Sequence, residues 1–133
     1  MSLPNGVLLD TSVIIDLARL DLGDFASTPP LTSAVCVAEL GFGLDVDDPV
    51  KRAVRTERYY AVLDQFEILP FDLAAAKQYA VLTSLVRRAG RDPRPRRMDL
   101  QIAATAVAHS VPLLTRNGDD FVGLDRLLDL LSI

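Results

Sequence analysis

The chain has 133 residues, with 14 Lys and Arg residues against 18 Asp and Glu residues, which gives a formal net charge of −4. With 50% hydrophobic and 24% charged residues, its composition is that of an ordinary globular protein and excludes a disordered or collagen-like chain. Because domains cluster near about 100 to 200 residues, we expect residues 1–133 to form a single domain around one core. A lone cysteine, Cys36, excludes a disulfide framework.

The charge is distributed unevenly along the chain. Residues 87–97 contain six arginines and one acid, a local charge of +5, so the other 122 residues, with 8 basic and 17 acidic side chains, carry −9. The net charge alone argues against binding of nucleic acid through a generally basic surface. The distribution nevertheless permits an acidic pocket beside a basic edge.

The sequence contains no convincing targeting segment. The N-terminus lacks a basic segment followed by an apolar stretch of signal-peptide length, and no run of 18 apolar residues is present. We therefore expect a cytoplasmic protein without a membrane partner.

Short apolar runs and helical patterns alternate along the chain. Apolar runs bounded by turn residues predict strands, and apolar residues repeating at a period of 3.6 predict helices. Gly90 ends one predicted helix, and the prolines that follow predict a loop over residues 91–96. This alternation predicts a three-layer α/β fold, with a mainly parallel central sheet and helices on both faces. The predicted strands are residues 7–9, 31–35, 68–71, 111–115 and 127–133, and the predicted helices are residues 13–20, 37–44, 50–66, 73–89, 98–109 and 120–124.

Acidic residues follow the predicted strands, where open α/β sheets place their sites. Asp10 closes the first strand, Glu39 follows the second, and Asp99 opens the apolar helix 98–109. Each acid alone is explained equally well by a structural role, as a helix cap or a first-turn charge, and by a functional role. Two carboxylates about 5 Å apart repel by about 3 kcal/mol, so a cluster of them requires protons or a cation. Oxygen ligands without nearby Cys or His favour Mg²⁺ or Mn²⁺ over Zn²⁺.

Four segments resemble, in order and spacing, the PIN-domain ribonucleases, and within them the VapC toxins of bacterial toxin–antitoxin pairs. They are residues 9–12 (LDTS), 38–40 (AEL), 98–104 (MDLQIAA) and 114–121 (LTRNGDDF). The resemblance covers nearly the whole chain. It implies a PIN-like fold and a Mg²⁺- or Mn²⁺-dependent endoribonuclease that cleaves phosphodiester bonds, with one or two metal ions. It also implies an RNA substrate, a VapB-like antitoxin and a homodimer.

The resemblance also assigns roles to individual residues. Asp10, Glu39 and Asp99 match the three best-defined catalytic, metal-holding acids of the family. Asp120 matches the acid that precedes the last motif's aromatic residue, whereas Asp119 is expected to be solvated. At the other polar position of the last motif, where the family has Asn or Asp, this chain has Asn117, which supplies no charge. Four residues would orient carboxylates or water: Thr11, Ser12, Thr115 and Asn117.

Two basic segments are candidate RNA contacts. The loop before Asp99 places arginines beside the expected metal site, and we expect Arg94, Arg96 and Arg97 to contact RNA phosphates. A second basic face, formed at i, i+3 and i+6 of the helix 50–66, is either solvated or part of an RNA or antitoxin surface. Its members are Arg52, Arg55 and Arg58.

Other chemistries fit the sequence less well. A haloacid-dehalogenase-like phosphatase needs a second Asp where Ser12 stands, and a receiver needs a Lys at the end of a late strand. His109, the only histidine, is expected at the end of its helix, and Cys36 in the core. A PIN fold kept only as a binding module would be favoured by loss of an acid, and none of the three best positions is lost.

Overall fold

The computed structural model describes residues 6–133, so residues 1–5 of the expected domain lie outside the described residues. Five strands form one sheet in the order β3-β2-β1-β4-β5, and every neighbouring pair is parallel. The predicted α/β fold with a parallel sheet is therefore confirmed. In the described part of the chain, no helix is long and apolar enough to cross a membrane. The strands are β1 (Val7–Leu9), β2 (Pro30–Ser33), β3 (Glu67–Leu69), β4 (Leu113–Thr115) and β5 (Leu130–Ser132).

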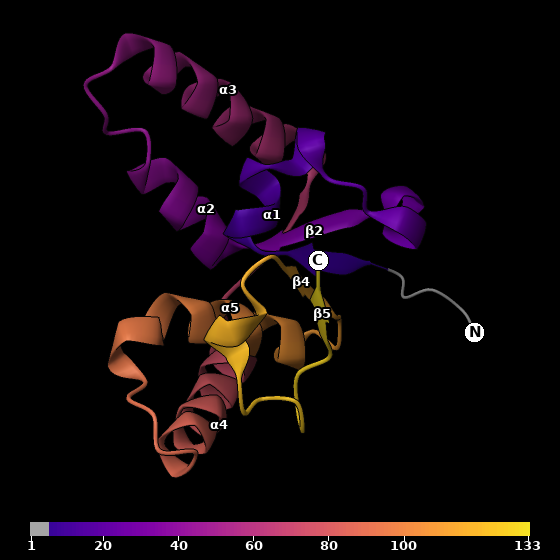
Figure 1. Cartoon of the computed structure of the whole chain (residues 1–133), viewed down its shortest axis with the longest axis vertical. Coiled ribbons are helices and arrows are strands. Elements are labelled where there is room, and N and C mark those ends of the chain that lie inside the picture. The colour runs from indigo at the N-terminus through magenta and orange to yellow at the C-terminus, as the bar shows by residue number, and fades with distance from the viewer. Residues whose placement is uncertain (1–5) are drawn as a thin grey trace.

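Helices cover both faces of this sheet, with α1 and α3 on one side and α4 and α5 on the other (Figure 1). Successive residues of a strand point to opposite faces. In β1, Val7 and Leu9 accordingly pack against α1 and α3, whereas Leu8 packs against α4 and α5. The helices are α1 (Thr11–Ile15), α2 (Ala34–Phe42), α3 (Pro49–Gln65), α4 (Leu73–Arg88) and α5 (Arg97–Ala108), and the 3₁₀ turns are η1 (Leu17–Arg19), η2 (Gly23–Ser27), η3 (Arg94–Arg96) and η4 (Gly118–Phe121).

Side-chain caps decide where several helices begin. The Ser33 hydroxyl accepts from the amide of Cys36 at 3.0 Å, and an Asp72 carboxylate oxygen accepts from the amide of Ala75 at 3.0 Å. The Ser33 cap starts α2 at Ala34, so the predicted strand 31–35 is too long by its last two residues. The Asp72 cap agrees with the predicted start of α4.

Other predicted boundaries are also wrong in detail. The helix predicted to reach Leu20 ends at Ile15, because Asp16 leaves helical geometry and its carboxylate pairs with Arg116. The predicted loop 91–96 contains the 3₁₀ turn η3, since proline is tolerated in the first turn of a helix, where its missing N–H has no partner to lose. The strands predicted at 68–71, 111–115 and 127–133 are each three residues long, and the helix predicted at 120–124 is the 3₁₀ turn η4.

The strand order brings the ends of three strands together. The chain leaves β1 to build β2 and β3 on one side, then returns to add β4 and β5 on the other. The carboxyl end of β1 therefore lies between those of β2 and β4, which is the switch point where open α/β sheets bind ligands. Asp10 follows β1 directly, Thr115 ends β4, and α2 leaves β2 at the same edge.

The packing between α4 and α5 predicts a large effect of one substitution. Leu82 of α4 is fully buried in the core on that face, while its neighbour Val81 is 45% exposed. We expect Leu82→Ala to lower the free energy of unfolding by about 2 to 5 kcal/mol, and Val81→Ala to change it by less than about 0.5 kcal/mol. Urea titration with an unchanged m-value would measure both; equal effects would contradict this packing.

Candidate metal centre

Asp10 is the most enclosed acid of the site, with 5% of its surface exposed. One carboxylate oxygen accepts from the amide of Thr11 at 2.9 Å. The other accepts from the hydroxyls of Ser12 at 3.0 Å and Thr115 at 2.8 Å. These three donors stabilise the ionised carboxylate and fix its orientation, as a buried charge requires.

The two hydroxyls are themselves held by the backbone after β4. The Ser12 hydroxyl accepts from the amide of Arg116 at 3.2 Å, and the Thr115 hydroxyl accepts from the amide of Asn117 at 3.0 Å. The Asp10 amide donates to the carbonyl of Leu114 at 2.9 Å. The turn after β1 and the end of β4 thus form one hydrogen-bonded unit around Asp10.

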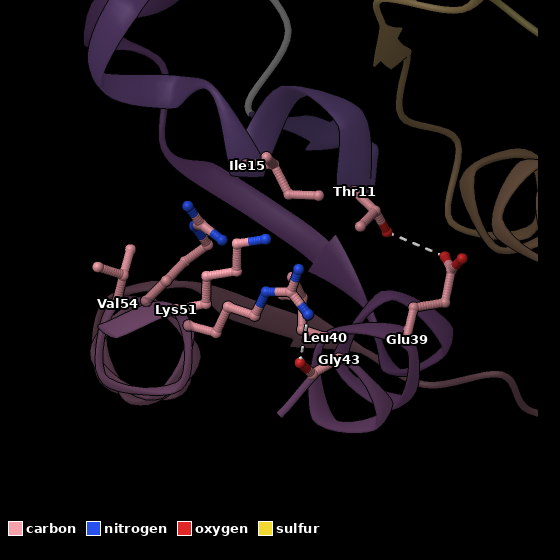
Figure 2. A pocket seen from close by; sticks show the side chains of 9 residues that line it. Thr11, Ile15, Glu39, Leu40, Gly43, Lys51 and Val54 are labelled. Atoms are coloured by element: carbon pink, nitrogen blue, oxygen red, sulfur yellow. Dashed lines mark hydrogen bonds between the residues drawn. The ribbon is translucent and has the colours of Figure 1, made fainter. Parts of the chain in front are cut away.

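Glu39 lies on α2, half-buried, and faces the same region. One of its carboxylate oxygens accepts from the hydroxyl of Thr11 at 2.9 Å (Figure 2). Burial raises the pKa of the Glu39 carboxyl, and the negative charge of Asp10 raises it further, while the Thr11 hydrogen bond opposes both effects. Thr11 therefore links the first two acids, through its amide to Asp10 and through its hydroxyl to Glu39.

Asp99 lies in the first turn of α5 and is half-buried. The pKa of its carboxyl is raised to about 6, first by burial and then by the negative charges of Asp120, Asp10 and Glu39, while Arg96 acts in the opposite direction. Four acids from four separate segments thus act on one another electrostatically. The fold collects negative charge at this edge that a cation would neutralise.

Asp120 already has a cationic neighbour. Arg96 lies 3.4 Å from one of its carboxylate oxygens and also donates to the carbonyl of Asp119 at 3.2 Å, where Arg91 donates at 3.3 Å. The side chains of Asp119 and Asn117 are exposed. Arg96 is therefore engaged with the acidic cluster, a pairing that sequence spacing does not reveal because 24 residues separate the partners.

The donor set fits a hydrated hard cation. Among residues 6–133, no three Asp, Glu, His or Cys side chains are gathered closely enough to enclose a metal ion by themselves. Mg²⁺ usually keeps several waters and is bound by one or two carboxylates together with substrate phosphate. Carboxylates that raise one another's pKa match that chemistry and not a zinc cage, and the one thiol close to them, Cys36, is buried with its pKa raised.

The remaining reactive groups lie elsewhere. Cys36 is buried in the core, and burial raises the pKa of its thiol, so it is no nucleophile. His109 caps the end of α5 opposite to Asp99, with Nε2 3.3 Å from the carbonyl oxygen of Pro70. Both residues therefore occupy the places predicted from the sequence.

The arginine loop borders the acids. A cavity of about 650 Å³ is lined by the acids Glu39 and Asp99 together with Arg94 and Arg97. Arg94 forms an ion pair with Asp92 at 2.9 Å but remains largely exposed, and Arg97 donates to the carbonyl of Arg94 at 3.3 Å. Of the three arginines predicted to contact RNA, Arg94 and Arg97 thus share a cavity with the acids, and Arg96 is paired with Asp120.

Comparison with known proteins adds an independent observation. A family model described as PIN domain matches residues 7–127. Ribonuclease VapC5 of Mycobacterium tuberculosis is 38% identical over 125 residues, which cover 92% of this chain and 90% of that protein. Ribonuclease VapC4 of the same organism is 36% identical over 114 residues, 84% of this chain and 86% of that protein. The crystal structure of VapBC-5, a member of the VapBC family of toxin-antitoxin systems from Mycobacterium tuberculosis, matches with a TM-score of 0.77 and 34% identity over 98% of both chains.

The raised pKa of Asp99 predicts that its charge destabilises the cation-free fold. The folded state binds this proton more tightly than the unfolded state, so ionised Asp99 lowers stability above pH 6 and costs nothing below pH 4. Solvent screens a half-exposed carboxylate, so we expect Asp99→Asn to raise the free energy of unfolding by about 1 kcal/mol at pH 8 in EDTA.

Thermal unfolding at several pH values would measure this effect. The gain should shrink as the pH falls from 6 to 4, and the exposed Asp125→Asn should show none of it. A loss of stability in Asp99→Asn at pH 8 would mean that the ionised carboxylate makes a net favourable contact.

Proposed function

The chain belongs to the PIN-domain family, and we propose that it is the ribonuclease toxin of a VapBC-type toxin–antitoxin pair. In this proposal Asp10, Glu39, Asp99 and Asp120 hold Mg²⁺ or Mn²⁺ and the enzyme hydrolyses RNA phosphodiester bonds. The observation that carries it is the gathering of carboxylates at the carboxyl edge of the sheet, where charge repulsion favours a bound cation. Two VapC ribonucleases that resemble the chain over more than four-fifths of its length support the choice of substrate.

The chain's own residues supply orientation and charge. The divalent cation, when bound, would activate water and stabilise the charge that develops on the phosphate and leaving oxygens. Ser12 and Thr115 hold one Asp10 oxygen, and the Thr11 amide holds the other, so the carboxylate keeps its direction without rearrangement. Thr11 also fixes Glu39. These carboxylates act as the scaffold for the cation and not as the nucleophile.

Arg96 contributes a fixed positive charge at the edge of this scaffold. Its guanidinium pairs with Asp120 and lowers the pKa of the Asp99 carboxyl, which keeps more of the cluster ionised. We infer that Arg96 limits the repulsion inside the cluster before a cation arrives. Asn117, whose side chain is exposed, would hold water at the rim.

The structural relatives suggest the partner. The crystal structure of VapBC-5 from Mycobacterium tuberculosis is described as a member of a family of toxin-antitoxin systems. We propose that this chain is likewise inhibited by a VapB-like antitoxin, forms a homodimer, and acts on RNA in the cytoplasm. A phosphotransfer activity loses its support with the PIN-domain match, whereas a purely RNA-binding PIN domain remains the alternative that activity measurements decide.

The role of Asp10 predicts a simple loss of activity. Asp10→Asn should lower RNA cleavage by at least about a hundredfold, because it removes one charged ligand while the amide keeps the shape of the side chain. Asp64→Asn, an exposed acid on α3, is the matched control and should cleave normally. Cleavage of a labelled RNA pool with Mg²⁺, followed on denaturing gels, would measure both variants, and full activity in EDTA would refute the metal mechanism.

The arginine loop predicts an ionic-strength effect. Arg94→Ala combined with Arg97→Ala should weaken RNA binding and reduce the slope of log affinity against log salt by about 1.4 for two lost phosphate contacts on a single strand. Arg96 is left intact so that its pairing with Asp120 does not complicate the result. An unchanged slope in filter-binding titrations would place the RNA elsewhere.

A further inference from the structure

A second cavity also has Glu39 in its lining. It has a volume of about 410 Å³ and lies between α1, α2 and α3 (Figure 2). Thr11 and Glu39 form its wall nearest the acidic cluster, and Ile15 and Leu40 contribute apolar surface. The opposite wall is a row on α3 that carries three cations and one apolar side chain: Lys51, Val54, Arg55 and Arg58.

The cations on α3 do not all have the same role. Arg55 donates to the carbonyl of Gly43 at 2.8 Å and so attaches α3 to the end of α2, as Figure 2 shows. Arg52, outside the cavity, donates to the carbonyl of Val46 at 2.9 Å. Lys51 and Arg58, by contrast, have neither an ion pair nor a side-chain hydrogen bond with any part of residues 6–133. The cavity therefore has two unpaired cations on its rim.

This combination of groups matches one kind of ligand. A phosphate suits the two cations, and a flat nucleobase suits the apolar surface made by Ile15, Leu40 and Val54. Glu39 also lines the cavity that contains Arg94 and Arg97, so both cavities that adjoin Glu39 have basic side chains in their lining.

We propose that this cavity is a nucleotide subsite for single-stranded RNA, in which Lys51 and Arg58 bind a backbone phosphate and the apolar wall packs against one base. The proposal rests on the ribonuclease function proposed above and locates a place where one nucleotide of the substrate strand binds. A base reaches the space between three helices only when it is free of its own stack and partner. Apolar packing without a polar reader makes this position tolerant of base identity.

The test uses binding in a background that does not cleave. Three variants would be titrated with a random single-stranded RNA of about twelve nucleotides in Mg²⁺. They are Asp10→Asn alone, Asp10→Asn with Lys51→Ala and Arg58→Ala, and Asp10→Asn with Lys77→Ala. We expect Lys51→Ala with Arg58→Ala to weaken binding about tenfold and to lower the salt slope by about 0.7, the value for one lost phosphate contact on a single strand. Lys77, an exposed lysine on α4, is the matched control and should change neither quantity.

Two further measurements separate the possible explanations. In the active enzyme the same double substitution should raise KM and leave kcat unchanged, because the subsite binds RNA away from the reacting atoms. Val54→Asp should weaken RNA binding further, since it places an anion on the apolar wall, and circular dichroism melting would verify that each variant is folded.

Each possible result of these measurements supports or overturns the proposed subsite. Normal RNA affinity and salt slope after Lys51→Ala with Arg58→Ala would overturn the subsite and leave the cavity to a protein partner. Equal loss of binding to single-stranded and fully duplex RNA would overturn the assignment to an unpaired strand. Absence of RNA binding by Asp10→Asn itself would instead contradict the proposed ribonuclease function, so the two failures are distinguishable.

Discussion

The geometry of the site depends on how a buried negative charge is compensated at Asp10. The carboxylate is 5% exposed, and an unpaired charge at that depth would be far too costly for a domain of this size. Three donors, from Thr11, Ser12 and Thr115, remove that cost and tie the turn after β1 to the end of β4. The hydrogen bonds that compensate this charge therefore hold the ends of β1 and β4 together, and the other acids lie around the fixed Asp10 carboxylate.

The acids around Asp10 are not compensated to the same degree. Glu39 has one hydroxyl donor, and Asp99 has a pKa of about 6 because burial and three neighbouring acids oppose its ionisation. Arg96 offsets part of this repulsion through Asp120. The proposed cation would relieve this electrostatic strain, and such strain is common in sites that are optimised for function and not for stability.

The sequence was sufficient for the architecture and for placing Asp10, Glu39 and Asp99 within electrostatic reach of one another, because alternating elements and strand ends are local patterns whose consequences in a parallel sheet are general. Their role as a metal site stays a prediction. The sequence was insufficient wherever a contact between residues distant in the sequence overrides a local pattern. Asp16 ends α1 by leaving helical geometry and pairing with Arg116, 100 residues away. Periodicity likewise could not show that α3 folds back over α2, which brings its cations to the same cavity as Glu39.

The amide hydrogen bond from Asp10 to the carbonyl of Leu114 couples the site to the global stability of the domain. Asp10 follows the central strand of a five-stranded sheet, and two of its partners, Leu114 and Thr115, belong to the neighbouring strand β4, so no peripheral segment can fray and take the carboxylate with it. Hydrogen exchange at this amide should accordingly occur only through global unfolding. Local unfolding therefore does not displace the Asp10 carboxylate, and an inhibitor of the proposed activity has to occupy or cover the site.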